Sequence, residues 1–326
     1  MQLGCVNHKY VGMRHRFRYG VISMLVAAVL LGYGVWRWSN TAGVSSQPPE
    51  VQEKKIHIVT SFYPLYFFTK AIVGGNIDVY NLTPAGAEPH DYEPTPKDVV
   101  RLETSNLIIV NGAFEPWADN IKENIADRQI QFLAVGAALF SKNYLDEAGA
   151  SMIDPHVWLS PRLATQIVEK ILVAVMQIDP AHAEEYRLRA ATLQVRLSSL
   201  DQEYRQGLAR CHRQDFVTSH NAFGYLAAEY GLNQIGIAGL SPDAEPSPRE
   251  LVSITTFAKI HDIRYIFFES LVSPKLAETI ANEIGAKTLV LNPLEGLTDE
   301  DIASGQEYFS VMQKNLVSLR LVLECV

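Results

Sequence analysis

From residue 55 onward, short runs of β-branched and aliphatic residues alternate with stretches of helical periodicity. The runs that predict strands are 56–60, 79–83, 106–110, 130–135, 215–219, 234–238, 263–268 and 287–291. The stretches that predict helices are 62–73, 96–104, 115–125, 222–230, 248–261, 275–284 and a last one from about 298 to near the C-terminus. Strands that alternate with helices pair in parallel and are covered by helices. The chain therefore predicts an α/β fold with two doubly wound lobes.

One long uninterrupted stretch separates the two halves. Asp179 is a suitable N-cap, Pro180 is a suitable first helical residue, and neither Gly nor Pro recurs before Gly207. Apolar residues recur at helical spacing, at Tyr186, Ala190, Leu193, Leu197, Leu200 and Tyr204. A helix over 179–209 would be about 45 Å long and would join the lobes as a rigid strut. Two helices with a kink are the alternative.

The expected domains follow from this division. Residues 1–53 form a signal or membrane-anchor segment with a tether, and 54–178 form the N-terminal lobe. Residues 179–209 are the linker helix, and 210–326 form the C-terminal lobe.

The N-terminal segment is typical of an exported protein. Residues 1–46 hold five basic residues and no acidic one, and residues 19–36 form an uncharged, largely apolar run of 18. Such a run predicts a signal peptide or a marginal membrane span that leaves the body outside the cytoplasm, and a buried core helix is the third reading. We expect a periplasmic or extracytoplasmic protein, either released or anchored by an uncleaved N-terminal membrane helix. In that oxidising compartment, Cys211 and Cys325 either pair or stay as thiols.

The remaining chain is acidic. Of the 28 Lys and Arg residues, 23 follow residue 46, and they accompany all 36 Asp and Glu residues, which gives this part a net charge of −13. Binding to nucleic acid needs a basic face, so a nucleic acid is excluded as partner. This negative charge is compatible with a protein that binds cations.

Three histidines lie in separate loop-like contexts beside turn residues, namely His90, His156 and His220. They are 66 and 64 residues apart, so only tertiary folding can bring them together. Each follows a predicted strand, and ligands of doubly wound sheets bind where the carboxyl ends of strands open into loops. Imidazole is the commonest neutral nitrogen ligand of zinc and its neighbours. We therefore predict a metal site between the lobes, with two ligands from the first lobe and one from the second.

The segments around these histidines, 86–94 (GAEPHDYEP), 154–159 (DPHVWL) and 219–225 (SHNAFGY), resemble the zinc- and manganese-binding solute-binding proteins of bacterial ABC transporters, the adhesin-like cluster A-I family. Segments 276–281 (LAETIA) and 291–297 (LNPLEGL) extend the resemblance, which spans about residue 54 to the C-terminus. It implies two α/β lobes joined by one long rigid helix, with the metal in the cleft between them. It also implies delivery of that metal to a membrane permease driven by a cytoplasmic ATPase.

The resemblance places the first three metal ligands on His90, His156 and His220. A histidine at the third position favours zinc, since zinc prefers nitrogen more than manganese does. Many zinc-binding members carry a histidine-rich insertion near residues 140–153, whereas this chain has no histidine there. A metal-gathering flap is therefore not expected.

The fourth ligand position of the family, often Asp, falls on Asn292 in this chain. An amide oxygen is a poor zinc ligand compared with a carboxylate. The candidates for the fourth position are therefore Asn292, a water, Glu88 and Glu269. Asp91 or Asp154 is expected to accept the second ring N–H of a ligating histidine.

These features predict an extracytoplasmic protein that binds a divalent transition metal, with zinc as the expected cargo, and delivers it to an ABC-type importer. We expect a monomer whose partners are the permease and its ATPase, and no enzymatic activity. The alternatives are a manganese or iron carrier of the same family, a surface adhesin, and a zinc hydrolase. A hydrolase also uses three histidines and an open fourth position, but the chain has no His-Glu-x-x-His helix.

Overall fold

The computed structural model describes residues 28–38, 55–113, 115–126, 128–145, 149 and 151–326. The chain divides into two units, residues 1–54 and residues 55–326. The described part of the first unit is a helix over residues 28–38. Among the described residues, no helix combines the length and the apolar character needed to cross a membrane. Residues 19–27 of the expected apolar run lie outside the described part.

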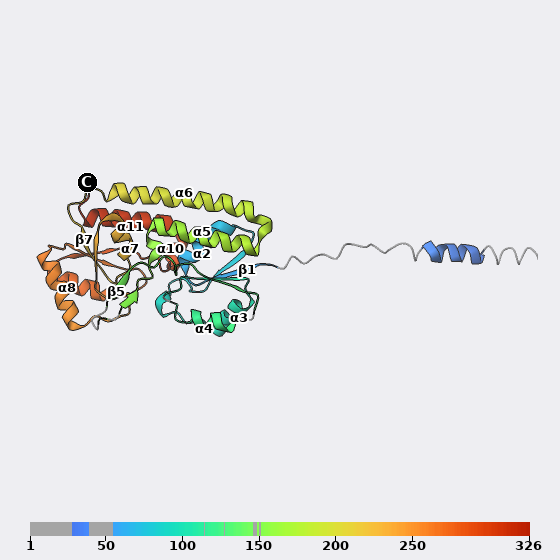
Figure 1. Cartoon of the computed structure of the whole chain (residues 1–326), viewed down its shortest axis with the longest axis horizontal. Coiled ribbons are helices and arrows are strands. Elements are labelled where there is room, and N and C mark those ends of the chain that lie inside the picture. Colours follow the sequence, from blue (N-terminus) through green and yellow to red (C-terminus); the bar gives the residue numbers. More distant parts are fainter. Residues whose placement is uncertain (1–27, 39–54, 114, 127, 146–148, 150) are drawn as a thin grey trace, which may run out of the picture. The chain divides into compact units, whose positions relative to one another are not determined.

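Two parallel four-stranded sheets organise the described part of the second unit (Figure 1). The first sheet has the order β2-β1-β3-β4 and contains β1 (His57–Thr60), β2 (Asp78–Asn81), β3 (Leu107–Val110) and β4 (Gln131–Ala134). The second has the order β10-β9-β7-β8 and contains β7 (Asp215–Thr218), β8 (Asn233–Gly236), β9 (Tyr265–Phe268) and β10 (Lys287–Val290). Counted along its own strands, each sheet has the order 2-1-3-4. All eight strands lie within two residues of their predicted positions.

Helices connect the strands within each lobe. They are α2 (Tyr63–Val73), α3 (Pro96–Thr104) and α4 (Ala118–Asn124) in the first lobe, and α7 (Gly224–Tyr230), α8 (Pro248–Ile260) and α9 (Lys275–Ile284) in the second. Capping boxes start α3, with Thr95 and Asp98, and α8, with Ser247 and Glu250. In both helices Pro occupies an early position whose N–H would have no helical partner. These local signals explain why both helices begin where the sequence predicts.

Helices cover both faces of each sheet. In β1, Ile58 packs in the cluster that contains α2, whereas its neighbour Val59 packs with α3 and α4. In β7, Phe216 packs in the cluster that contains α7 and α11 (Tyr308–Val322), whereas Val217 packs with α8 and α9. Successive side chains of a strand point to opposite faces, so both faces of each sheet are buried. The predicted doubly wound α/β fold is confirmed.

A single long helix joins the lobes. α6 runs unbroken over Ala183–Gly207, and its predicted apolar stripe is buried. Near its start, the Arg189 guanidinium donates to the carbonyl of Val73 at 3.1 Å. Near its end, the Tyr204 hydroxyl donates to the carbonyl of Met312 at 2.7 Å. The helix is therefore fixed to the first lobe at one end and to α11 of the second lobe at the other (Figure 1).

The start of this helix differs from the prediction. Asp179 does not cap it, because its carboxylate makes no capping bond and instead accepts hydrogen bonds from the Tyr186 hydroxyl and the His182 ring. Pro180–His182 form a 3-10 turn, η3, and the α-helix begins only at Ala183.

Three further elements depart from the predicted pattern. An 18-residue helix, α5 (Pro161–Ile178), precedes η3 and packs along α6. The stretch expected as a plain loop contains a hairpin of β5 (Asn143–Leu145) and β6 (Ser151–Ile153). The expected last helix is two helices, α10 (Asp299–Ala303) and α11, because the chain turns at Gly305 with φ of +74°.

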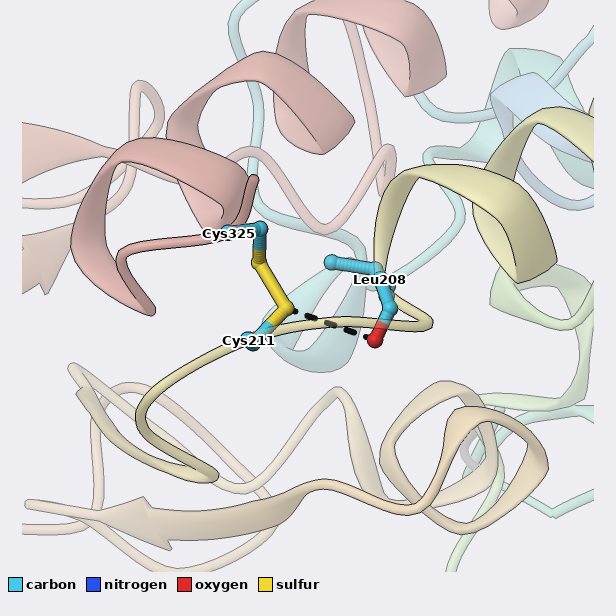
Figure 2. Close-up of a disulfide and its surroundings, with 3 residues drawn as sticks. All are labelled: Leu208, Cys211 and Cys325. Carbon is cyan, nitrogen blue, oxygen red and sulfur yellow. Dashed lines mark hydrogen bonds between the residues drawn. A yellow bond between two sulfur atoms is a disulfide. The ribbon is translucent and has the colours of Figure 1, made fainter.

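A disulfide links Cys211 to Cys325 (Figure 2). It joins the segment after α6 to the end of the chain, so it fastens the C-terminus to the start of the second lobe. Of the two outcomes that the sequence left open, the paired state is the one found. The bridge spans 114 residues, and a cross-link over so long a loop typically stabilises a fold by about 2–4 kcal/mol.

The burial of α6 makes a direct prediction. We expect Leu197→Ala to lower the free energy of unfolding by about 2–5 kcal/mol, because Leu197 is fully buried and its loss leaves a cavity. Val195→Ala, on the exposed face of the same helix, should change it by less than about 0.5 kcal/mol. Urea unfolding followed by circular dichroism measures both. Equal effects of the two substitutions would contradict the packing described.

Candidate metal centre

Four side chains meet at the junction of the lobes. His90 lies in the 3-10 helix η1 (Pro89–Asp91) after β2, and His156 immediately precedes the 3-10 helix η2 (Val157–Leu159). His220 follows the end of β7, and Glu295 lies in the loop between β10 and α10. Two of the four side chains therefore come from the first lobe and two from the second.

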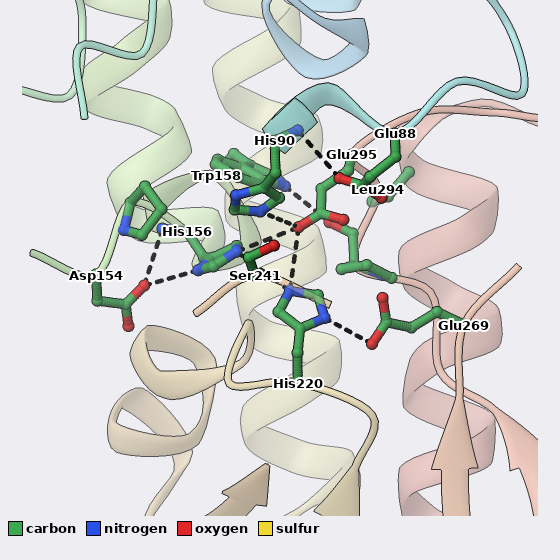
Figure 3. A network of polar contacts seen from close by, with 12 residues as sticks. Glu88, His90, Asp154, His156, Trp158, His220, Ser241, Glu269, Leu294 and Glu295 are labelled. Carbon is green, nitrogen blue, oxygen red and sulfur yellow. Dashed lines mark hydrogen bonds and ion pairs between the residues drawn. The ribbon is translucent and has the colours of Figure 1, made fainter. Parts of the chain in front are cut away.

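The four side chains form a compact group, which we call the His3Glu group. The Nε2 atoms of His90, His156 and His220 each lie 3.2 Å from the same atom, Oε1 of Glu295 (Figure 3). The Nε2 atoms of His156 and His220 are 3.4 Å apart. Both of these histidines and Glu295 are at most 1% exposed. The structure thus brings together the three predicted histidines and adds Glu295.

These spacings fit a tetrahedral metal ion. Ligand atoms at about 2.0–2.1 Å from a central zinc ion are about 3.3 Å apart along each edge of the tetrahedron. The observed separations of 3.2 and 3.4 Å agree with that value. In addition, Oε2 of Glu295 is buried without a hydrogen-bond partner, which is costly for a charged oxygen unless a cation is near. The His3Glu group is therefore built to hold a small divalent cation.

Carboxylates orient two of the rings. Nδ1 of His156 donates to Oδ1 of Asp154 at 2.9 Å, and Nδ1 of His220 donates to Oε1 of Glu269 at 2.6 Å. Because ionised carboxylates only accept, one ring proton stays on Nδ1, and Nε2 is the atom that can offer a lone pair to a metal. The prediction for Asp154 is confirmed. Asp91 instead contacts Asp243.

The same contacts set the charges of the site. Burial favours the neutral form of His156 and His220, but the carboxylates Asp154, Glu269 and Glu295 outweigh it and raise the pKa of both rings. Burial also favours the neutral form of Glu295, but the imidazoles around it hold the pKa of its carboxyl well below the usual range. Without a metal, the site therefore tends to keep protons on its rings around one carboxylate.

A short, tightly bonded loop presents Glu295. The preceding residue, Leu294, has φ of +59°, a left-handed conformation that such a residue rarely adopts. Its N–H donates to Oδ1 of Asn292 at 2.7 Å. The indole N–H of Trp158 donates to the carbonyl of Pro293 at 2.8 Å, which fastens the loop to the first lobe. These bonds aim the carboxylate at the histidines.

Asn292 braces this loop and is not part of the His3Glu group. Its Oδ1 accepts from Leu294, and its Nδ2 donates to the Ser270 hydroxyl at 2.8 Å. Its backbone N–H and carbonyl bond to the side chain of Asn315 at 2.9 and 2.6 Å. Both polar atoms of the side chain are thus engaged. The structure replaces Asn292 with Glu295 as the fourth side chain.

The other two carboxylates considered for the fourth position lie beside the group. Glu269 contacts the far nitrogen of His220, and Glu88 accepts the backbone N–H of His90 at 3.2 Å. Burial and the negative charge of Glu295 raise the pKa of Glu88 to about 9, which keeps its carboxyl protonated near neutral pH.

A sequence signal for Glu295 does exist. It is the acidic residue of segment 291–297, three positions after Asn292, and it follows the last strand of the second sheet. Loops at the carboxyl ends of strands are where ligands of such sheets gather. The rule that predicts the three histidines therefore also applies to Glu295.

A cavity between the lobes reaches one member of the His3Glu group. The cavity measures about 1020 Å³ and is bordered by His90. Tyr144 and Pro155 line it from the first lobe, and Leu240 and Pro246 line it from the second. The site therefore lies in an inter-lobe cleft, as predicted.

Two doubly wound lobes, one connecting helix and a His3Glu group in the cleft define a two-lobed, metal-binding solute-binding protein. The chain belongs to the family described as zinc-uptake complex component A, periplasmic, whose model matches residues 58–321.

Known relatives are similar over most of the second unit. The high-affinity zinc uptake system protein ZnuA of Bacillus subtilis is 40% identical over 277 residues, which cover 82% of this chain and 87% of that protein. The zinc-binding protein AdcA of Streptococcus pyogenes is 39% identical over 292 residues, which cover 83% of this chain but 57% of AdcA. This chain thus spans little more than half the length of AdcA. The crystal structure of the Zn(II)-bound ZnuA-like domain of Streptococcus pneumoniae AdcA matches with a TM-score of 0.72 and 41% identity, covering 83% of this chain and 99% of that one.

The charges of the site predict a pH dependence for the metal-free protein. The raised pKa values of His156 and His220 contribute stability that is fully present below about 6.5, their unfolded value, and is lost as the pH rises through the folded values. The lowered pKa of Glu295 contributes stability that is present above about 4.5 and is lost as the pH falls through its folded value. We therefore expect the free energy of unfolding to fall as the pH rises above about 6.5.

Denaturant titrations of chelator-treated protein at a series of pH values measure this effect. Glu295→Gln is the control, because it removes the anion that holds the ring protons and should flatten the dependence on the alkaline side. An unchanged slope in that variant would show that other groups cause it.

Proposed function

We propose that this protein binds zinc with high affinity outside the cytoplasmic membrane and delivers it to an ABC-type importer. The observation that carries the proposal is the convergence of three imidazole Nε2 atoms on one buried carboxylate oxygen, each at 3.2 Å. The names of the relatives, a zinc uptake system protein and a zinc-binding protein, support zinc as the cargo. The family description supports the location.

The ligand chemistry favours zinc over manganese. Zinc has no geometric preference of its own and is commonly held by four ligands in a tetrahedron. Manganese prefers oxygen ligands in a higher coordination number. Three nitrogen atoms and one oxygen atom within 4.8 Å of one another therefore suit zinc best.

We further propose that the protein carries its metal and does not use it for catalysis. A catalytic zinc keeps one position open for a water molecule, whereas here four side chains each offer a ligand atom within 4.8 Å of the other three. The neighbouring carboxylates Asp154 and Glu269 each accept a ring N–H and so are engaged in orienting ligands. This arrangement favours a carrier over a hydrolase.

The division of the ligands between lobes offers a route to release. His90 and His156 belong to the first lobe, and His220 and Glu295 to the second. If residues 54–178 and 210–326 move as separate lobes about the linker helix, a small separation moves the two ligands of one lobe away from the two ligands of the other. In this proposal the permease, driven by its cytoplasmic ATPase, triggers that separation. One chain supplies all four ligands, so a monomer suffices.

Substitutions in the His3Glu group test the proposal. We expect His220→Ala and Glu295→Gln each to weaken zinc binding by more than about 100-fold, beyond the roughly 10–100-fold typical of losing an outer hydrogen-bond partner. Competition titration against a chromophoric zinc chelator measures the affinity. His182→Ala removes a half-exposed histidine that is not part of the His3Glu group, and it is the matched control. Wild-type affinity in both site variants would sink the proposal.

The raised pKa values predict how binding depends on pH. Zinc must displace the protons held by His156 and His220, so binding should release protons and grow tighter as the pH rises. Calorimetry in two buffers of different ionisation enthalpy reports the proton release.

In the same experiments, zinc should displace manganese. Tighter binding of manganese than of zinc would contradict the proposed cargo.

A further inference from the structure

We propose that Gly224 and Tyr225 of α7 are positioning residues that set the ring of His156 by holding Asp154 from the opposite lobe. The inference rests on the proposed zinc function and deepens it. It makes the orientation of a first-lobe ligand depend on residues of the second lobe.

Tyr225 ties together the base of the β5–β6 hairpin. Its hydroxyl donates to the carbonyl of Asp154 at 3.1 Å and accepts from the backbone N–H groups of Ser141 at 3.1 Å and Lys142 at 3.3 Å. A phenol has one proton to donate and two lone pairs, so all of its hydrogen-bonding capacity is used. The backbone N–H of Asp154 also donates to the carbonyl of Lys142. One hydroxyl from the second lobe therefore holds both ends of the hairpin.

Gly224 allows the Asp154 carboxylate to approach. A Cβ atom at position 224 would lie 2.7 Å from Oδ2 of Asp154, which is closer than ordinary contacts allow. Gly224 is not among the residues with positive φ, so its conformation does not require glycine. The requirement is therefore steric, and it concerns the carboxylate.

Asp154 transmits this constraint to the metal ligand. Its Oδ1 accepts both the backbone N–H of His156 at 3.0 Å and the ring Nδ1–H at 2.9 Å. Asp154 and Tyr225 are both at most 5% exposed, so water does not compete for these bonds. The carboxylate is thus held between α7 on one side and His156 on the other. A shift of the carboxylate would turn the ring and misdirect its Nε2 atom.

Zinc titrations of the full chain test the inference. We expect Gly224→Ala to weaken zinc binding by about 10-fold or more, as does loss of the outer partner itself in Asp154→Asn. Because Gly224 acts through Asp154, the double variant should bind zinc no more weakly than Asp154→Asn alone. Tyr225→Phe should weaken zinc binding by a smaller factor, and it provides the test if Gly224→Ala does not fold.

Two matched controls come from the chain itself. Gly75→Ala adds a methyl group where nothing lies within 4 Å, and Tyr230→Phe removes a hydroxyl of the same helix that donates to Asp201. Neither should change zinc affinity. In nitrogen-15 NMR spectra, the Nδ1–H resonance of His156 should shift in Gly224→Ala and Tyr225→Phe. The corresponding resonance of His220, which is bonded to Glu269, should stay in place.

The outcomes separate the two proposals. Wild-type protein that binds no zinc overturns the proposed function, while the His156 resonance, recorded also without metal, still decides on the positioning role. Wild-type protein that binds zinc, with unchanged affinity and unchanged His156 resonance in both α7 variants, overturns the positioning role alone. Additive effects of Gly224→Ala and Asp154→Asn overturn it as well.

Discussion

The contact between the Glu295 carboxylate and three imidazoles is the interaction on which the rest of the site depends. A buried anion is costly unless positive charge lies beside it, and here that charge comes from ring protons or from a metal. The carboxylate faces one histidine from each of three loops that are far apart in the chain. Satisfying this one anion therefore requires both lobes to be folded and in contact.

Each lobe also holds the ligands of the other in place. Trp158 of the first lobe bonds the loop that carries Glu295, and the Tyr308 hydroxyl of the second lobe donates to the carbonyl of Trp158 at 2.6 Å. In the reverse direction, Tyr225 of the second lobe bonds Asp154. Both lobes therefore build the cleft, and these bonds between the lobes also orient the ligands.

Much of this architecture follows from local sequence signals. The strands were predictable because buried runs such as 106–110 and 263–268 lie between clear helices, and helix starts were predictable where Pro follows a capping residue. The three histidines were predictable because each follows a strand. α5 is not among the predicted helices, although Ser160 and Pro161 mark its start. The sequence places Glu295 after the last strand, but its role as the fourth side chain depends on a left-handed residue and on a bond from Trp158. Such contacts are tertiary and leave no periodic trace in the chain.

The way α6 is fastened bears on how far the cleft can open. Arg189 fixes the helix to the first lobe, and Tyr204 fixes it to the second, so a wide hinge motion would have to bend or detach a 25-residue helix. Metal–ligand distances at a formed site lie within about 0.2 Å of their usual values. A tilt that shifts one lobe by roughly 1 Å would exceed that range. Under the proposed carrier function, the bound and released states would therefore differ by a displacement smaller than the width of one atom.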